Sequence, residues 1–347
     1  MPVPEHLYIH VPFCASKCPY CAFYSETETP FADYAELVSR ELELRGFAGL
    51  RWKTIYIGGG TPSLIRNSQF TIHNLQFIEL TVECNPADIT PEFAAQLAES
   101  GVTRVSVGAQ SFDDATLRFL GRRHDSATTR AAVSGLRHAG IGNISLDLMA
   151  SVPGFENSLR EAADLEPEHI SVYPLSIEPG TDFHKRGVKC LPDDDTMDQL
   201  AAAEDFLVSR GYGRYEISNY CKPGCECRHN LAVWRGADYA AAGPAAASRA
   251  GLERRMNIPD LRLWAEALRS GELPRGTVET LTPEEDERER FITGLRLGEG
   301  VRPDTNERVG TCIKLVHAGV MRDTGGGVYT LTRRGREVAD AVAAEFI

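Results

Sequence analysis

The sequence contains no apolar run that approaches the roughly 20 residues needed to cross a bilayer, which predicts a chain without a membrane span. Its first residues, MPVPEHLYIHVPF, lack the basic stretch followed by an apolar stretch that marks a signal peptide. Both absences predict a cytoplasmic protein. An excess of basic residues is also missing, since the net charge is −12 at pH 7. Nucleic-acid affinity depends on dense lysine and arginine, so this charge argues against a nucleic-acid partner.

Cysteines are unevenly spaced along the chain. There are nine, an odd number, and a chain in a reducing compartment is not expected to rely on disulfides. One group consists of Cys14, Cys18 and Cys21, and a second of Cys221, Cys225 and Cys227. Such clustering indicates metal chemistry.

The first half of the chain repeats one pattern from about residue 6 to 180. A short β-branched apolar run is followed by a loop marked by glycine or proline and then by a stretch with helical periodicity. Strands that alternate with helices predict a parallel sheet, and the near-continuous apolarity of these runs predicts that both of its faces are covered. Six such units predict an α/β fold, a partial (β/α)6 TIM-type barrel. The six runs are Leu7–Val11, Thr54–Ile57, Ile78–Val82, Val105–Val107, Ile144–Met149 and His169–Leu175.

The second half predicts three further parts. A helix is expected over 196–209, and the Ala- and Gly-rich stretch 236–251 is expected to form a compact loop against the barrel. Another helix begins after Thr282, where Glu285 completes a capping box. The tail then resembles a small α+β, winged-helix-like domain that packs on the barrel rather than binding DNA. We therefore predict a core over 1–235, a connecting segment over 236–280 and a C-terminal domain over 281–347.

The segment CASKCPYC places three thiols directly after the first predicted strand. The C-terminal ends of barrel strands are where barrel active sites lie, and thiolates are the usual ligands of iron–sulfur clusters. Three thiolates leave one iron with an open coordination position. A structural zinc ion needs four ligands, and His10 is available as the fourth, so the spacing alone leaves zinc open.

Polar or glycine residues lie at the ends of the next four predicted strands. Gly58-Gly59-Gly60-Thr61-Pro62 ends the second strand, where glycine allows close approach of the backbone to a ligand. Glu83 ends the third strand, Gln110 follows the fourth and Asp147 lies late in the fifth, while Arg122 is in the helical region that follows Gln110. Because the ends of parallel strands meet on one rim, these residues are expected to surround the same site as the cysteine loop.

Seven segments together resemble the radical S-adenosylmethionine (SAM) family of oxygen-independent coproporphyrinogen III oxidases, and most closely its haem-chaperone branch. The resemblance runs from about residue 6 to the C-terminus. The segments are YIHVPFCASKCPYCAF, YIGGGTPS, VECNP, VSVGAQSFDD, LDLM, SVYPLSIEPGT and CRHN.

The resemblance implies a [4Fe-4S] cluster and SAM as cofactors, with an electron donor such as flavodoxin or ferredoxin as a partner. Cys14, Cys18 and Cys21 would bind the cluster. Arg122 would pair with the carboxylate of SAM. Glu83 and Asp147 would accept hydrogen bonds from the amino group or the ribose hydroxyl groups of SAM. The residues implied to surround SAM are Tyr8, Gly59, Gly60, Thr61, Glu83, Gln110, Arg122 and Asp147.

Within this family the sequence favours the chaperone branch, because Phe23 replaces the fourth cysteine of the oxidases. That branch implies haem or a porphyrin as a ligand, with His229 of CRHN as a candidate haem contact, and a haem-acceptor protein as a partner. The chain departs from the branch at Val233, where the branch has tyrosine, and at Ala247, where it has histidine. Coproporphyrinogen III oxidation, methyl transfer and a non-catalytic iron–sulfur role remain alternatives.

Cys221 and Cys225 have two interpretations. They are either small buried apolar residues or members of a second metal or redox site with Cys227 or His229.

Overall fold

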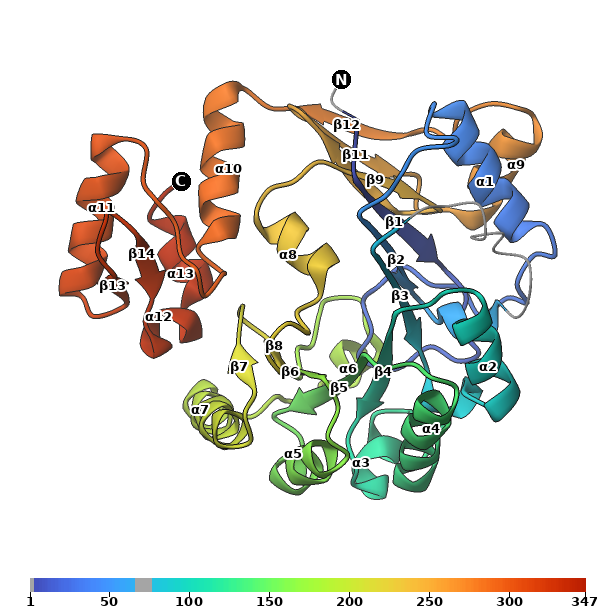
Figure 1. Ribbon diagram of the computed structural model, residues 1–347, viewed down its shortest axis with the longest axis horizontal. Coiled ribbons are helices and arrows are strands. Elements are labelled where there is room, and N and C mark those ends of the chain that lie inside the picture. The colour runs from blue at the N-terminus through green and yellow to red at the C-terminus, as the bar shows by residue number, and fades with distance from the viewer. Residues whose placement is uncertain (1–2, 66–76) are drawn as a thin grey trace.

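Six parallel strands, adjacent in chain order, form the centre of the fold (Figure 1). The computed structural model describes residues 3–65 and 77–347. All neighbouring pairs from β1 to β6 are parallel, so the predicted partial barrel is confirmed. The strands are β1 (His6–Val11), β2 (Thr54–Gly59), β3 (Glu79–Cys84), β4 (Arg104–Gln110), β5 (Ile144–Ala150) and β6 (His169–Pro174).

Helices cover the outer face of this sheet. Residues such as Ile55, Val105 and Leu146 are fully buried on that face in the main hydrophobic core, together with Phe93 of α2 and Leu136 of α4. The helices are α1 (Tyr34–Leu44), α2 (Pro91–Glu99), α3 (Asp114–Phe119), α4 (Ser126–His138), α5 (Phe155–Asp164), α6 (Asp182–Lys185) and α7 (Asp193–Ser209), with short 3-10 turns η1 (Pro62–Leu64) and η3 (Pro86–Asp88). The helix predicted over 196–209 is part of α7.

The inner face of the strands is polar, which corrects the prediction of near-continuously apolar strands. Successive side chains of a strand point to opposite faces, so each strand presents apolar groups outward and polar groups inward. The inner face lines a cavity and not a second hydrophobic layer. Its polar residues are His6, Tyr8, His10, Thr54, Tyr56, Glu79, Thr81, Glu83, Arg104, Ser106, Ser145, Asp147, His169, Ser171 and Tyr173.

Further strands extend the sheet at both edges. β7 (Gly213–Arg214) and β8 (Asn219–Cys221) continue it antiparallel beyond β6. At the other edge, β9 (Tyr239–Ala242) pairs parallel with β1, and β10 (Ala247–Ala250), β11 (Glu253–Asn257) and β12 (Gly276–Thr280) follow antiparallel. The prediction of a compact loop over 236–251 is therefore wrong. Small alanines fit β9 between β1 and β10, where Ala240, Ala241 and Ala242 are buried.

The C-terminal residues form a unit to one side of the sheet, coloured orange to red in Figure 1. It has a separate cluster of buried apolar residues that includes Phe291, Cys312 and Tyr329. The predicted capping box is present, since Thr282 accepts from the Glu285 amide and the Glu285 carboxylate accepts from the Thr282 amide. The elements are α10 (Pro283–Gly294), α11 (Asn306–His317), β13 (Met321–Asp323), β14 (Tyr329–Leu331), α12 (Arg333–Glu337) and α13 (Ala339–Ala344).

Two more helices complete the described chain: α8 (Arg228–Trp234), which contacts β2 and α10, and α9 (Leu261–Arg269), which packs on α1. Among residues 3–65 and 77–347, no helix is both long and apolar enough to cross a membrane.

Candidate functional site

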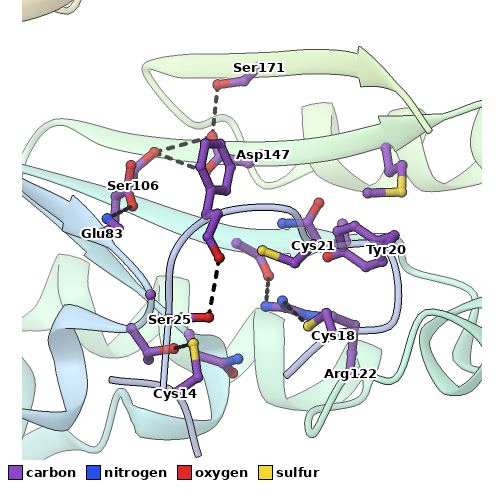
Figure 2. A pocket seen from close by; sticks show the side chains of 18 of the residues that line it. Cys14, Cys18, Tyr20, Cys21, Ser25, Glu83, Ser106, Arg122, Asp147 and Ser171 are labelled. Atoms are coloured by element: carbon purple, nitrogen blue, oxygen red, sulfur yellow. Dashed lines mark hydrogen bonds between the residues drawn. The ribbon is translucent and has the colours of Figure 1, made fainter. Parts of the chain in front are cut away.

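A cavity of about 620 Å³ opens on the inner face of the partial barrel (Figure 2). The loop after β1 lines its mouth with Cys14, Cys18 and Cys21. Residues 59–62 after β2 line another side, and inward residues of β3 to β6 line the interior. The structure thus brings together the cysteines and most of the rim residues predicted from the sequence.

Backbone hydrogen bonds close the base of the cysteine loop. The Cys14 amide donates to the Glu26 carbonyl at 2.9 Å, and the Glu26 amide donates to the Pro12 carbonyl at 2.6 Å. Within the loop the Cys21 amide donates to the Cys18 carbonyl at 3.1 Å. These contacts hold all three cysteines at the end of β1, where each lines the cavity.

Two of the three thiols already accept hydrogen bonds from residues of the same site. Thr61 Oγ1 donates to Cys14 Sγ at 3.6 Å, and Arg122 Nη1 donates to Cys18 Sγ at 3.4 Å. Burial raises the pKa of Cys21. The site therefore offers three thiols and hydrogen-bond donors to sulfur, which is the donor chemistry that iron–sulfur clusters use.

A four-ligand zinc site is not supported. His10, the candidate fourth ligand, is buried with Nε2 bonded to the Tyr24 carbonyl at 2.9 Å and Nδ1 bonded to the Tyr8 hydroxyl at 3.0 Å. Across the described part of the chain, no three His, Cys, Asp or Glu side chains are gathered as a metal-ligand group. That statement covers Cys221, Cys225 and Cys227.

The glycines after β2 are required by close contact with the cysteine loop. Gly59 has φ +115, and a side chain there would meet the His10 ring at 2.8 Å; one at Gly60 would meet the Phe13 carbonyl oxygen at 2.7 Å. The amides of Gly60 and Thr61 donate to the carbonyls of Val11 and Phe13, both at 2.7 Å. The glycine run thus fixes the position of the cysteine loop as well as lining the cavity.

Two partly buried carboxyl groups lie inside the cavity. Glu83 accepts from the Tyr56 hydroxyl at 2.7 Å and from the Gly59 amide at 3.1 Å. Desolvation by burial raises its pKa from the usual 4.5 to about 7, although these two donors oppose the shift.

Asp147 is held by serine hydroxyls from three strands. Ser171 donates at 2.7 Å and Ser106 at 3.0 Å (Figure 2). Ser145 donates at 3.2 Å. Desolvation raises the pKa of Asp147 as well. Both groups line the cavity, on the rim where the sequence analysis expected them.

A backbone irregularity in β4 aims Gln110 into the cavity. Gln110 has φ +66, and the pairing of β4 with β5 shifts register between Val107 and Gln110. Bulges of this kind re-aim side chains near active sites. The Tyr173 hydroxyl donates to Gln110 Oε1 at 2.8 Å. Arg122 reaches the same region and donates from Nη2 to the Gly108 carbonyl at 2.9 Å.

The structure does not bring Tyr8 and His229 to the cavity wall. Tyr8 stacks on Tyr56, with ring centroids 6.2 Å apart. The His229 ring lies at the N-terminal end of the barrel strands, where its Nδ1 is bonded to Oγ1 of Thr54, the first residue of β2, at 2.8 Å. The His229 amide donates to the carboxylate of Glu79, the first residue of β3, at 3.1 Å.

Burial lowers the pKa of His229 to about 3. The CRHN segment therefore closes the N-terminal end of the barrel strands. In this position His229 has a buried hydrogen-bonding role and not a ligand role. Val233 and Ala247, where the chain departs from the chaperone branch, also lie outside the cavity lining.

The cavity residues that the sequence analysis missed include Tyr56, Arg104, Ser106, Ser171 and Tyr173 on the inner faces of the strands. Arg104 is almost fully buried, and its Nε and Nη1 have no hydrogen-bond partner among the described residues. Alternation was the signal that could have found them, because polar residues recur at every second position of β4 and β6 within otherwise apolar runs.

Comparisons with known proteins agree with this geometry. The family model described as the radical SAM superfamily matches residues 8–165. "Heme chaperone HemW" of Mycobacterium tuberculosis is 33% identical over 98% of this chain and 94% of its own length. The protein of the same name from Haemophilus influenzae is 38% identical over 69% of each chain.

Among solved structures, coproporphyrinogen III oxidase (HemN) from Escherichia coli superimposes with a TM-score of 0.85 at 22% identity, over 100% of this chain and 91% of that one, which shows a shared fold. The sequence matches go further than the fold, because the Mycobacterium tuberculosis protein matches 98% of this chain at 33% identity. The chain belongs to the radical SAM superfamily and, within it, to the family of HemW haem chaperones.

Proposed function

We propose that Cys14, Cys18 and Cys21 hold the [4Fe-4S] cluster that radical SAM proteins carry, and that SAM fills the cavity behind it. The observation that supports this most strongly is that three thiols from one loop line the same cavity as two partly buried carboxyl groups. Three thiolates leave one iron free for SAM. When bound, the cluster supplies an electron to the sulfonium of SAM.

Different residues of the cavity are suited to different groups of SAM. Arg122 is a partly buried cation whose Nε is buried and has no partner among the described residues, so it suits the SAM carboxylate. Glu83 and Asp147 suit the amino group and the ribose hydroxyls as acceptors. Gly59, Gly60 and Thr61 form the wall of the cavity next to the cysteine loop. The side-chain amide of Gln110 is a further polar contact for SAM. Tyr8 acts through Tyr56 and His10 rather than by contact.

We further propose that the protein is a haem chaperone, which binds haem and passes it to an acceptor protein in the cytoplasm. The support is the name shared by relatives that match nearly the whole chain, together with Phe23. This side chain is 71% exposed and lines the cavity mouth, where the oxidases have a cysteine. An exposed aromatic ring is a suitable contact for a flat macrocycle.

Haem titration followed by Soret absorption tests this proposal. We expect wild type to shift the Soret band and to release haem to an apo-acceptor, apo-myoglobin serving as the probe. Phe23→Ala should weaken haem binding, whereas Leu263→Ala, which removes a 50% exposed side chain on α9, should not. No Soret shift in wild type would contradict the chaperone function. Multiple turnovers of coproporphyrinogen III decarboxylation would identify an oxidase instead.

The three parts of the chain are proposed to divide these tasks. Residues 1–235 carry the cofactor site, 236–280 widen the sheet beside β1, and 281–347 form a separate unit without a cavity residue.

A further inference from the structure

Arg104 is a buried cation at the end of the barrel strands that lies farthest from the thiols. It is the first residue of β4, whereas the cysteine loop follows the last residue of β1. Because the strands from β1 to β4 are parallel, these two positions are at opposite ends of the strands. Arg104 is only 2% exposed, and it nevertheless lines the same cavity as Cys14, Cys18 and Cys21. The cavity therefore has three thiols at one end and an arginine at the other.

The protein leaves hydrogen-bond donors of this arginine unused. Nε and Nη1 of Arg104 are buried and have no hydrogen-bond partner among the described residues. A guanidinium has five N–H donors and is always charged, and a buried charge without partners is costly. An arginine that lines a cavity in this state is suited to a ligand that brings acceptors.

Three carboxyl groups of the same strands have donors of their own. Glu79 accepts from the backbone amides of Arg228 at 3.0 Å and of His229 at 3.1 Å. Glu83 accepts from a tyrosine hydroxyl and a glycine amide, and Asp147 accepts from serine hydroxyls. The three carboxyl groups are therefore bonded without Arg104, whose guanidinium stays available to a ligand.

Burial limits the negative charge that two of these acids place in the cavity. Desolvation raises the pKa of Glu83 to about 7 and that of Asp147 above its usual value. At neutral pH these two groups carry less negative charge than exposed carboxyls do. An anion that approaches Arg104 is therefore repelled less than three fully ionised carboxylates would repel it.

The carboxylate of SAM has a separate arginine. Arg122 donates to Cys18 Sγ at 3.4 Å and to the Gly108 carbonyl at 2.9 Å, and these bonds hold it at the thiol end. Gly108 lies beyond Arg104 on β4, about 13 Å further along the strand. The single carboxylate of SAM therefore suits Arg122, and Arg104 is left for a second acceptor.

Asn230 adds a polar group at the deep end. Its helix, α8, begins at Arg228, and the first two amides of this helix bond to Glu79, the first residue of β3. The start of α8 therefore lies at the same end of the strands as Arg104, and Asn230 lines the cavity from there. The side-chain amide of asparagine offers two N–H donors. A guanidinium and an amide at one end of a cavity form a donor set for a carboxylate.

We propose that Arg104 is the anchor of a carboxylate-binding subsite at the deep end of the cavity, for a ligand other than SAM. The proposal rests on the proposed position of SAM beside the thiols. A guanidinium holds a carboxylate through two parallel charge-assisted hydrogen bonds, and no covalent bond changes. The carboxylate belongs either to a propionate arm of a tetrapyrrole such as haem or to a free small carboxylic acid, and the experiment separates these two sources.

The test uses the cluster-loaded chain with SAM bound and compares wild type with three variants. Arg104→Gln removes the charge, and Arg104→Lys keeps the charge without the planar fork of donors. Arg160→Gln, at an exposed arginine of α5 that does not line the cavity, is the matched control. Haem and haem dimethyl ester, which has no free carboxylate, are titrated by Soret absorption. Binding of glutarate, a small dicarboxylate, is followed by saturation-transfer NMR.

We expect wild type and Arg160→Gln to bind haem about tenfold more tightly than its ester, and Arg104→Gln to bind the two equally. Arg104→Lys should keep part of this preference and should bind SAM as wild type does. If the source is a free acid, glutarate should give saturation transfer in wild type that is lost in Arg104→Gln.

A preference for haem over its ester that persists in Arg104→Gln would overturn the subsite. Equal binding of haem and ester in wild type without a glutarate signal would overturn it as well. Weaker SAM binding by Arg104→Lys would assign the guanidinium to SAM and have the same consequence. Absence of any haem binding in wild type would instead refute the proposed chaperone function, while the glutarate comparison still tests Arg104, so the two failures are distinguishable.

Discussion

Glu83 provides a test of the SAM site in which pH and mutation must agree. Its pKa is raised by burial to about 7 in the protein without SAM. A cationic ligand favours the ionised carboxyl, so SAM affinity should fall as the pH drops through 7. At pH 6 about one tenth of the groups are ionised, which corresponds to a roughly tenfold weaker affinity, or about 1.4 kcal/mol.

The variant Glu83→Gln separates this effect from the titration of SAM itself. Gln keeps the shape of the side chain and cannot ionise, so the part of the pH dependence that comes from Glu83 should disappear. At pH 8 the variant should bind SAM more weakly than wild type by about 1.5–3 kcal/mol, the usual size for a charged hydrogen bond. Anaerobic calorimetric titration of both proteins between pH 6 and 8.5 measures these differences.

Stability without SAM should change in the opposite direction. A carboxyl whose folded pKa lies above its unfolded pKa stabilises the fold fully below about 4.5, and the contribution is lost as pH rises through 7. The interval from 4.5 to about 7 corresponds to about 3 kcal/mol at most. Glu83→Gln should therefore be more stable than wild type at pH 8 and similar at pH 4.5. Identical pH profiles of SAM affinity in the two proteins would refute this account of Glu83.

Three other predictions follow from the contacts of the site. Arg122→Met should lower the reduction potential of the cluster, because it removes a positive charge and a hydrogen bond to Cys18 Sγ; an unchanged potential in an EPR-monitored redox titration would contradict this. His229→Ala should leave the haem Soret spectrum unchanged but destabilise the fold by about 1–3 kcal/mol, since it removes a buried hydrogen bond of the Thr54 hydroxyl, which keeps only its bond to His6; loss of the Soret shift in a folded variant would restore the ligand role. Ser171→Ala should raise the pKa of Asp147 further and weaken SAM binding, which titration calorimetry would detect, with Ser134→Ala, at an exposed residue of α4 that does not line the cavity, as the control.

Local patterns were enough to predict the six central strands and the cysteine loop, because strand periodicity and ligand spacing are properties of short segments. The alanine-rich β9 was missed, since alanine has no strong preference for strands and only the narrow space beside β1 selects it. The position of His229 depends on where α8 closes the barrel, which no local pattern encodes. Gln110 was predicted, but its orientation needed the bulge after Val107.

The most direct test of the central claim is an anaerobic measurement of iron content together with EPR after reduction, with and without SAM. Wild type should contain about four irons per chain and a signal that SAM alters. Replacing Cys14, Cys18 and Cys21 together by Ala should abolish both, whereas the control Cys221→Ser/Cys225→Ser should retain both. A full cluster in the triple variant, or an iron loss confined to the control, would contradict the assignment of the cluster to the loop after β1.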